Sequence, residues 1–207
     1  MNGYLTPDAP GVAELVEKRS RFIGRVWPAG SEEEARARIE ETKKLHYDAR
    51  HNCWCYVLRA GALRYSDDGE PQGSAGQPML NVFRAGGVTD AVCVVTRYFG
   101  GVLLGAGGLA RAYSAAAKAA LDKAGLRRMA RWQSFRLPCP YPLYERVKRL
   151  LDGHEAAVED CAFGAEVCFS FLLREDRAEG FLAALTEASA GALRPEILGT
   201  SFRGVRI

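Results

Sequence analysis

Residues 90–113 read DAVCVVTRYFGGVLLGAGGLARAY, and they join a predicted strand to a predicted helix through a run of glycines. The apolar run at 90–99 is typical of a buried strand. The alanine-rich, amphipathic sequence at 109–123 predicts a helix, and Gly125 follows its end. Glycines at 100–108 allow positive φ and close approach of the backbone to another group. This stretch predicts a strand, a glycine loop and a helix within an α+β domain.

The sequence before this unit predicts further strands and helices. Strand patterns cover 14–27, as one strand or as two joined near Arg19, and then 52–58 and 63–65. Ser31 and Glu34 form a capping box that starts a helix reaching about residue 45. A short helix is expected at 79–84, after a loop at 66–76. Residues 1–130 are therefore predicted to form one mixed domain.

The sequence after residue 130 has a cleaner pattern. Strands are predicted at 134–139, 156–163, 166–173 and 193–198, with helices at 142–151 and 176–188, the second capped by Asp176. The order strand, helix, strand, strand, helix, strand is that of the ferredoxin-like split βαβ motif. Residues 131–207 are expected to form this second domain, packed closely after the first because no long linker separates them.

Basic residues gather around the glycine loop. The chain carries a formal net charge of +3, whereas residues 97–131 hold seven basic side chains and one acidic one. Backbone N–H groups at a helix start favour an anion, and guanidinium groups clamp phosphate. The predicted anion or nucleic-acid site comprises Arg97, Gly105, Gly107, Gly108, Arg111 and Lys118. The alternative is that the glycines serve close packing alone and that the basic residues form a solvated helix face.

A second group of polar residues lies in and before the loop at 66–76. Asp67 and Asp68 offer carboxylate oxygens that suit magnesium, and His51 offers a base or a phosphate donor. Turn chemistry for the carboxylates and ordering of a strand entry by the histidine are the commoner roles. We therefore predict no catalytic residue, no metal site and no cofactor, and keep these three residues as an additional candidate site.

Composition limits the class of protein. The chain has 207 residues, 48% of them hydrophobic, which excludes a disordered protein. The uncharged run from Tyr98 to Ala110 is shorter than the roughly 20 residues of a spanning helix. The N-terminal sequence lacks the pattern of a signal peptide. The six cysteines form no CxxC pair, and most lie in strand-like runs that favour buried thiols. We expect a cytoplasmic protein without membrane contact.

Four motifs resemble those of the YigZ/Impact family: EKRSRFIG (17–24), ARHNCWCY (49–56), SDDGEPQGSAGQP (66–78) and VTRYFGGVLLGAGGLARAY (95–113). The resemblance implies a first domain similar to the second domain of a small-subunit ribosomal protein and to domain four of elongation factor G. It implies a second, ferredoxin-like domain of the kind found in the bacterial YigZ branch. It carries no catalytic residue to this chain.

The resemblance also shapes the functional expectation. Eukaryotic Impact relatives regulate translation, and they carry a different domain beside the shared one. We expect this chain to bind RNA, the ribosome or translation factors without catalysis. One alternative is a magnesium-dependent enzyme that acts on a small phosphorylated substrate through the glycine loop. Another is an adaptor between proteins. The sequence indicates no oligomeric state.

Overall fold

The computed structural model describes residues 3–205 and divides into two compact units. Tyr4–Arg128 form the N-terminal unit, and Met129–Val205 together with Gly3 form the C-terminal unit. The division lies inside one long strand, β7 (Leu126–Cys139), so no linker of irregular structure separates the units. None of the helices in the described residues has the length and apolar character needed to cross a membrane.

The N-terminal unit contains an antiparallel sheet in the order β2-β3-β6-β4-β5. Its strands are β2 (Gly11–Glu17), β3 (Ser20–Pro28), β4 (His51–Val57), β5 (Leu63–Ser66) and β6 (Ala91–Tyr98). Strand β6 is buried along seven of its eight residues, as expected for the centre of a sheet that is covered on both faces. The apolar run at 90–99 therefore contains the central strand of the sheet.

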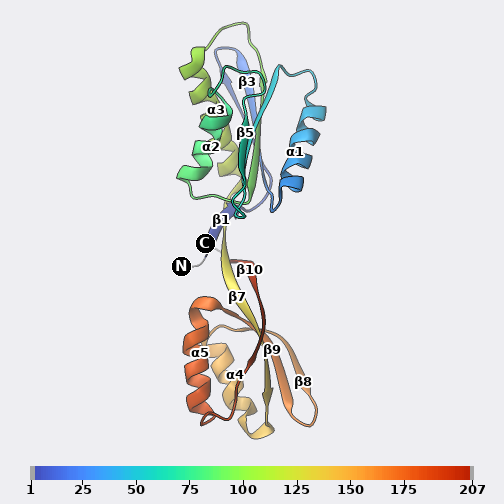
Figure 1. The fold of residues 1–207 in the computed structure, drawn as a ribbon, viewed down its shortest axis with the longest axis vertical. Helices are drawn as coiled ribbons and strands as arrows, with labels where there is room; N and C mark the ends of the chain where they lie inside the picture. Colours follow the sequence, from blue (N-terminus) through green and yellow to red (C-terminus); the bar gives the residue numbers. More distant parts are fainter. Residues whose placement is uncertain (1–2, 206–207) are drawn as a thin grey trace. The chain divides into compact units, whose positions relative to one another are not determined.

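Helices cover both faces of this sheet (Figure 1). α2 (Gly76–Ala85) and α3 (Gly105–Ala124) pack with Cys93 and Val95 of β6 in one core. α1 (Glu32–Leu45) packs on the opposite face, in a smaller core that contains Val92 and Val94. Successive side chains of a strand point to opposite faces, so β6 contributes to both cores, and β4 does the same through Cys53 and Tyr56.

Local sequence signals explain how two of these elements begin. Lys18 and Arg19 both have positive φ and form the two-residue turn between β2 and β3, in which Glu17 is the partner of Ser20. Of the two alternatives for 14–27, the one with two strands joined near Arg19 is thus confirmed. The side chain of Ser31 accepts a hydrogen bond from the Glu34 amide at 3.2 Å, which confirms the predicted cap of α1.

The glycines at the start of α3 do not all lie where the sequence predicted. The helix begins at Gly105 rather than at residue 109, so Gly105, Gly107 and Gly108 form its first turn instead of a preceding loop. Only 99–104 connect β6 to the helix. The alanine-rich sequence favours a helix strongly enough for propagation back through the glycines, which cost only about 1 kcal/mol each.

Close packing of α3 on the sheet depends on other glycines. A Cβ at Gly24 of β3 would lie 2.4 Å from the Ala116 carbonyl oxygen, and one at Gly11 of β2 would lie 2.3 Å from the Ala120 oxygen. In the connection between β6 and α3, a Cβ at Gly100 would lie 2.0 Å from the backbone carbonyl of Arg19. The glycines of the first turn of α3 meet no such backbone. Packing therefore accounts for Gly11, Gly24 and Gly100, and leaves Gly105 and Gly107 without a packing role.

The C-terminal unit confirms the predicted βαββαβ order. Its elements are β7, the 3₁₀ turn η1 (Tyr141–Leu143), α4 (Tyr144–Gly153), β8 (Ala157–Phe163), β9 (Val167–Arg174), α5 (Glu175–Ala188) and β10 (Glu196–Val205). β9 lies between β7 and β8, and β10 pairs with β7, as in a ferredoxin-like sheet. The short strand β1 (Tyr4–Pro7) belongs to the N-terminal unit. α4 and α5 contribute Val147, Leu151, Phe181 and Leu185 to the core.

Two strands and one helix cap in this unit differ from the prediction. β7 begins at Leu126 rather than at residue 134, and the last strand covers 196–205 rather than 193–198. Asp176 does not cap α5: Arg174 is the N-cap, and the Asp176 carboxylate accepts from the Arg174 guanidinium instead. An ion pair with a neighbouring side chain has replaced the expected bond to the helix backbone.

Candidate functional site

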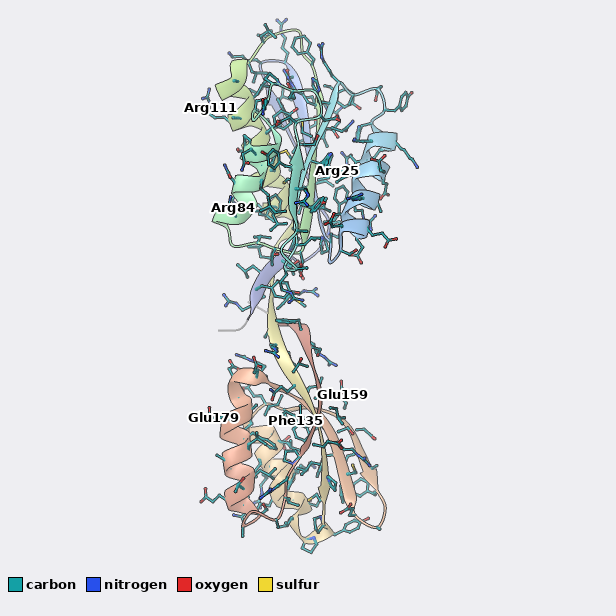
Figure 2. The ribbon with its side chains drawn as sticks, in the orientation of Figure 1. Arg25, Arg84, Arg111, Phe135, Glu159 and Glu179 are labelled. Atoms are coloured by element: carbon teal, nitrogen blue, oxygen red, sulfur yellow. The ribbon has the colours of Figure 1, made fainter. Side chains whose placement is uncertain are left out.

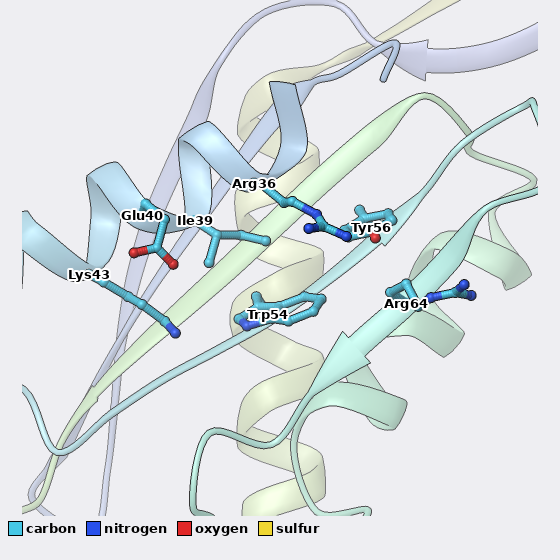
Figure 3. Close-up of a pocket in the computed structure, with 7 residues that line it drawn as sticks. All are labelled: Arg36, Ile39, Glu40, Lys43, Trp54, Tyr56 and Arg64. Carbon is cyan, nitrogen blue, oxygen red and sulfur yellow. The ribbon is translucent and has the colours of Figure 1, made fainter. Parts of the chain in front are cut away.

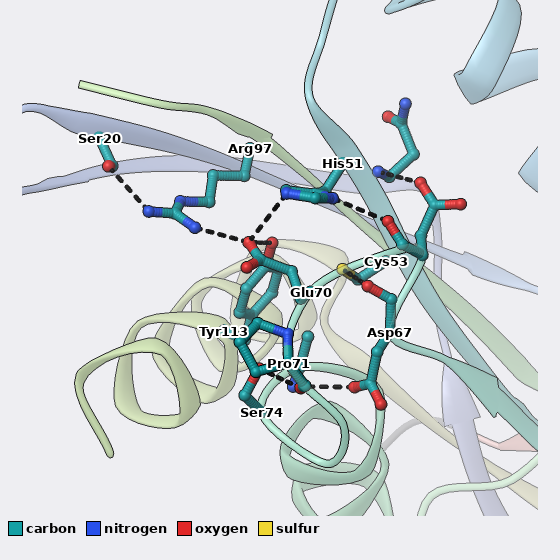
Figure 4. A network of polar contacts seen from close by, with 12 residues as sticks. Ser20, His51, Cys53, Asp67, Glu70, Pro71, Ser74, Arg97 and Tyr113 are labelled. Atoms are coloured by element: carbon teal, nitrogen blue, oxygen red, sulfur yellow. Dashed lines mark hydrogen bonds and ion pairs between the residues drawn. The ribbon is translucent and has the colours of Figure 1, made fainter. Parts of the chain in front are cut away.

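A buried carboxylate organises the centre of the N-terminal unit. Glu70 is 8% exposed, and its Oε1 atom accepts from Arg97 Nη1 at 2.7 Å and from the Tyr113 hydroxyl at 2.8 Å (Figure 4). Arg97 is 5% exposed and donates a further bond to Ser20 Oγ at 3.3 Å. Burial raises the pKa of the Tyr113 phenol, which therefore remains a donor to the carboxylate. The network joins β3, β6, α3 and the 67–75 loop.

This arrangement corrects one part of the predicted anion site. Arg97 was expected to face an external phosphate, but its guanidinium is bonded to Glu70 inside the protein. The guanidinium also lies 5.5 Å from the ring centres of both Phe22 and Phe99. A buried arginine needs a buried counter-charge, and Glu70 supplies it. Arg97 thus holds the 67–75 loop to the sheet.

Asp67 has a structural role at the start of α2. Its carboxylate accepts backbone N–H groups from Gly73 at 2.8 Å, Ala75 at 3.0 Å and Gly76 at 2.8 Å. Ala75, the N-cap residue, has no side chain able to do this, so Asp67 caps the helix from eight residues away. The Asp67 carboxylate therefore acts as a turn residue that accepts hydrogen bonds from nearby backbone amides, which is the commoner role stated for it above.

His51 and Asp68 are brought together, as the sequence predicted, but through the backbone. His51 Nδ1 bonds to the Asp68 carbonyl oxygen at 2.7 Å; a carbonyl only accepts, so this nitrogen carries a proton. His51 Nε2 lies 3.9 Å from Glu70 Oε1. The Asp68 carboxylate accepts from the Asn52 amide at 2.7 Å and lies 3.8 Å from Lys43 Nζ. Both residues order the loop against β4.

These contacts bear on the magnesium hypothesis. Asp67 and Asp68 direct their oxygens to backbone amides rather than toward one common point. Among the residues described by the structure, no group of three or more histidine, cysteine, aspartate or glutamate side chains is arranged to hold a metal ion. The carboxylates that the enzyme hypothesis would use for magnesium are engaged in the structure of the loop.

The N-terminal end of α3 is built differently from that of α2. Leu104 is its N-cap, no side chain caps it, and its first turn holds no acidic residue. Gly105, Gly107 and Arg111 are exposed, and the guanidinium of Arg111 reaches within 3.6 Å of the Cβ position of Gly107. Figure 2 shows Arg111 on the outer side of α3. Unpaired N–H groups beside a free guanidinium form a surface suited to an anion.

An apolar rim adjoins this helix end. Leu103 is 82% exposed, and Val102 and Phe99 are also exposed. The Arg50 guanidinium lies 5.6 Å from the centre of the Phe99 ring. An exposed ring flanked by guanidinium groups is a surface on which a nucleobase can stack. Phe99, rather than Tyr98, is the ring left open: the Tyr98 hydroxyl bonds to His46 and Asp48.

The positive charge of residues 97–131 is largely paired in the folded chain. Lys118 pairs with Asp122, Arg127 with Asp8 and Arg131 with Glu175, besides the pair of Arg97 with Glu70. Arg111 has no carboxylate partner within the residues described. Surface pairs of this kind are weak and can be exchanged for an incoming phosphate. Of the six predicted residues, Gly105, Gly107, Gly108 and Arg111 share the helix end, whereas Lys118 lies further along α3.

Sequence reasoning missed Glu70, Tyr113 and Ser20 as members of one network. Glu70 was grouped with the acidic turn, because Glu-Pro is turn chemistry in its own right. A signal was available: a strand arginine in an otherwise apolar run requires an internal acid, and the 66–76 loop holds the nearest unassigned carboxylates. The choice among those carboxylates needed the tertiary structure.

Comparisons with known proteins identify the family. The Impact N-terminal domain model matches residues 18–121, and a model described as a domain of unknown function, DUF1949, matches 137–192. Each corresponds to one unit of the structure. The first covers the central sheet, the Glu70 network and the end of α3.

Relatives match along nearly the whole chain. An IMPACT family member of Haemophilus influenzae is 35% identical over 202 residues, covering 96% of this chain and 98% of its own. YigZ of Escherichia coli is 35% identical over 94% of this chain and 97% of its own, and YvyE of Bacillus subtilis is 33% identical over 92% and 89%. A crystal structure of a hypothetical protein superposes with a TM-score of 0.62 at 33% identity, covering 96% of this chain and 98% of the other. The chain belongs to the IMPACT family.

Proposed function

We propose that this IMPACT family protein binds single-stranded RNA as part of an association with the translation machinery. The single observation that carries the proposal is the open N-terminal end of α3. There, exposed glycine amides and the unpaired guanidinium of Arg111 lie together with no acidic residue in the turn. Phosphate oxygen is the ligand that both groups recognise.

Gly107 supports this assignment because the fold does not require a glycine at this position. Gly107 is exposed and helical, and a Cβ there would meet nothing nearer than Arg111 at 3.6 Å. Alanine at this position would favour the helix by about 1 kcal/mol. A glycine that costs helix stability without relieving a clash leaves the backbone N–H groups open to close approach by a ligand.

The apolar rim supplies a second type of contact. Phe99 stacks with arginine and is exposed, and it lies in the connection that leads directly into the amide-rich turn. A chain of RNA offers phosphates for the helix end and bases for the ring. Base stacking is tolerant of sequence, so little sequence preference is expected.

Fluorescence anisotropy with a labelled single-stranded RNA, titrated at several salt concentrations, tests the proposal. Phosphate contacts make the logarithm of affinity fall linearly with the logarithm of salt. Arg111→Glu should weaken binding at least about tenfold and flatten the salt slope. Lys123→Glu is the matched control, because it makes the same charge change at the opposite end of α3.

Gly107→Ala separates binding from folding. It should stabilise the unit by about 0.5–1 kcal/mol while it weakens RNA binding, because the methyl group stands where the phosphate approaches. Salt-independent binding, or equal effects of Arg111→Glu and Lys123→Glu, would rule out a phosphate site at this helix end. Loss of RNA binding altogether, with retention of ribosomal proteins on the purified chain, would favour the adaptor hypothesis.

A further inference from the structure

A groove lies on the opposite face of the N-terminal sheet, between α1 and the strands β4 and β5 (Figure 3). Its volume is about 350 Å³, within the range of small-molecule sites. The lining residues come from α1, β4 and β5: Arg36, Ile39, Glu40, Lys43, Trp54, Tyr56 and Arg64. None of them belongs to the α3 helix end.

Two aromatic rings form the base of this groove. Trp54 and Tyr56 lie on the same face of β4, stacked with centres 5.8 Å apart and planes 5° from parallel. Tyr56 is buried, and its hydroxyl donates to Glu32 Oε2 at 2.8 Å, so its ring is held in place. Trp54 is half-buried and presents the more accessible ring. A fixed, partly open indole is a ready surface for stacking an aromatic ligand.

Three cations line the groove, with Lys43 on one side of the indole and Arg36 and Arg64 toward Tyr56 (Figure 3). Lys43 lies 3.8 Å from Asp68, and Arg36 lies 3.3 Å from Glu32, both in solvent-accessible pairs that contribute little energy. Arg64 donates to the Leu63 carbonyl oxygen and has no carboxylate partner among the residues the structure describes. Glu40 is the single acidic residue of the lining. A groove that contains an accessible indole and three cations suits a ligand with an aromatic base and a negative charge.

We infer that this groove binds a nucleotide, with its base stacked on Trp54 and its phosphate held by Arg64. The groove is apolar along Ile39 and the indole, as a base requires, and positive at its edges, as a phosphate requires. A free nucleotide and the terminal nucleotide of an RNA present the same chemistry. The site is independent of the α3 end, because the two lie on opposite faces of the sheet.

Isothermal titration calorimetry with adenosine monophosphate, alongside tryptophan fluorescence, tests this inference on the full chain. Saturable binding with quenching of indole emission is expected, and Trp54→Leu should weaken it at least about tenfold and remove the quenching. Arg64→Glu should also weaken it by about tenfold while leaving the fold intact, because this side chain is exposed. Adenosine and inorganic phosphate, each offered alone, should bind more weakly than the nucleotide.

Arg38→Glu is the matched control for Arg64→Glu: it makes the same charge change on the side of α1 away from the groove, at an exposed residue paired with Glu41. A 5′-phosphorylated RNA trinucleotide forms the second arm. Tighter binding of the trinucleotide identifies an RNA end as the source, and equal binding identifies the free nucleotide. No saturation at millimolar nucleotide in either arm, or unchanged affinity in Trp54→Leu, would overturn the inference. Arg111→Glu should leave nucleotide binding unchanged, which separates this site from the proposed RNA surface.

Discussion

The Arg97 guanidinium donates to Glu70 Oε1 across 2.7 Å, and both side chains are almost sealed from solvent. The pair connects the central strand β6 to the loop before α2. Since β6 contributes side chains to the cores on both faces, the loop is anchored to the most buried element of the unit. The motif that the sequence offered as a phosphate clamp therefore divides into an internal ion pair and an external helix end.

Replacement of the buried acid should be costly. Glu70→Gln keeps the size of the side chain but leaves the Arg97 charge without a partner, and we expect a loss of about 3–5 kcal/mol in the free energy of unfolding. Urea denaturation followed by circular dichroism measures it. Glu14→Gln, which breaks the exposed pair with Arg21, should lower the free energy of unfolding far less, because exposed ion pairs contribute little. Similar losses in the two variants would contradict the structural role of Glu70.

The remote cap of α2 gives a second prediction. Asp67→Ala removes the acceptor of three backbone N–H groups, and two of these belong to the first turn of α2 or its N-cap. We expect a loss of about 1–3 kcal/mol, because amides near the sheet are left unbonded. Amide hydrogen exchange should show reduced protection in 73–80 before other parts of the unit. Protection that falls uniformly across the unit would argue against a local capping role.

His46 should make stability depend on pH. Burial lowers the pKa of His46 below its ordinary value of 6.5, with the Arg25 charge acting in the same direction. The unfolded chain then binds more protons than the folded one between the lowered pKa and about 6.5, so stability falls as pH falls through this window. Titration of the histidine ring protons by NMR should place this pKa below 6.5. In His46→Gln the pH dependence in that window should become flatter.

The cysteines should react in two classes. Burial raises the pKa of Cys53 and Cys93, and Cys53 also donates to the Asp67 carbonyl oxygen, so these thiols stay protonated and inaccessible. Cys161 and Cys168 are half-exposed and should be alkylated first in the native protein. Mass spectrometry after a timed treatment with iodoacetamide at pH 8 measures the order. Early labelling of Cys53 would contradict the packing described for β4.

Much of the secondary structure follows from local patterns. The hairpin at Arg19, the cap at Ser31 and the βαββαβ order are set by contacts between neighbours in the chain, or by the repeat of apolar residues. The exact start of α3 was not predictable in this way. Propagation from the alanine-rich segment overcame the helix-breaking tendency of the glycines, and that balance depends on how α3 packs against β2 and β3.

In the candidate sites too, some features follow from local sequence and others depend on the tertiary structure. The sequence by itself determined that Gly105, Gly107, Gly108 and Arg111 lie near the start of one helix, because adjacent residues suffice to place backbone N–H groups and a guanidinium on one helix end. Only the tertiary structure decided that Arg97 faces Glu70 and that Trp54, Arg64 and Lys43 line one groove. Those partners are far apart in the chain, and burial, rather than residue type, determines which charges are paired inside and which remain open to a ligand.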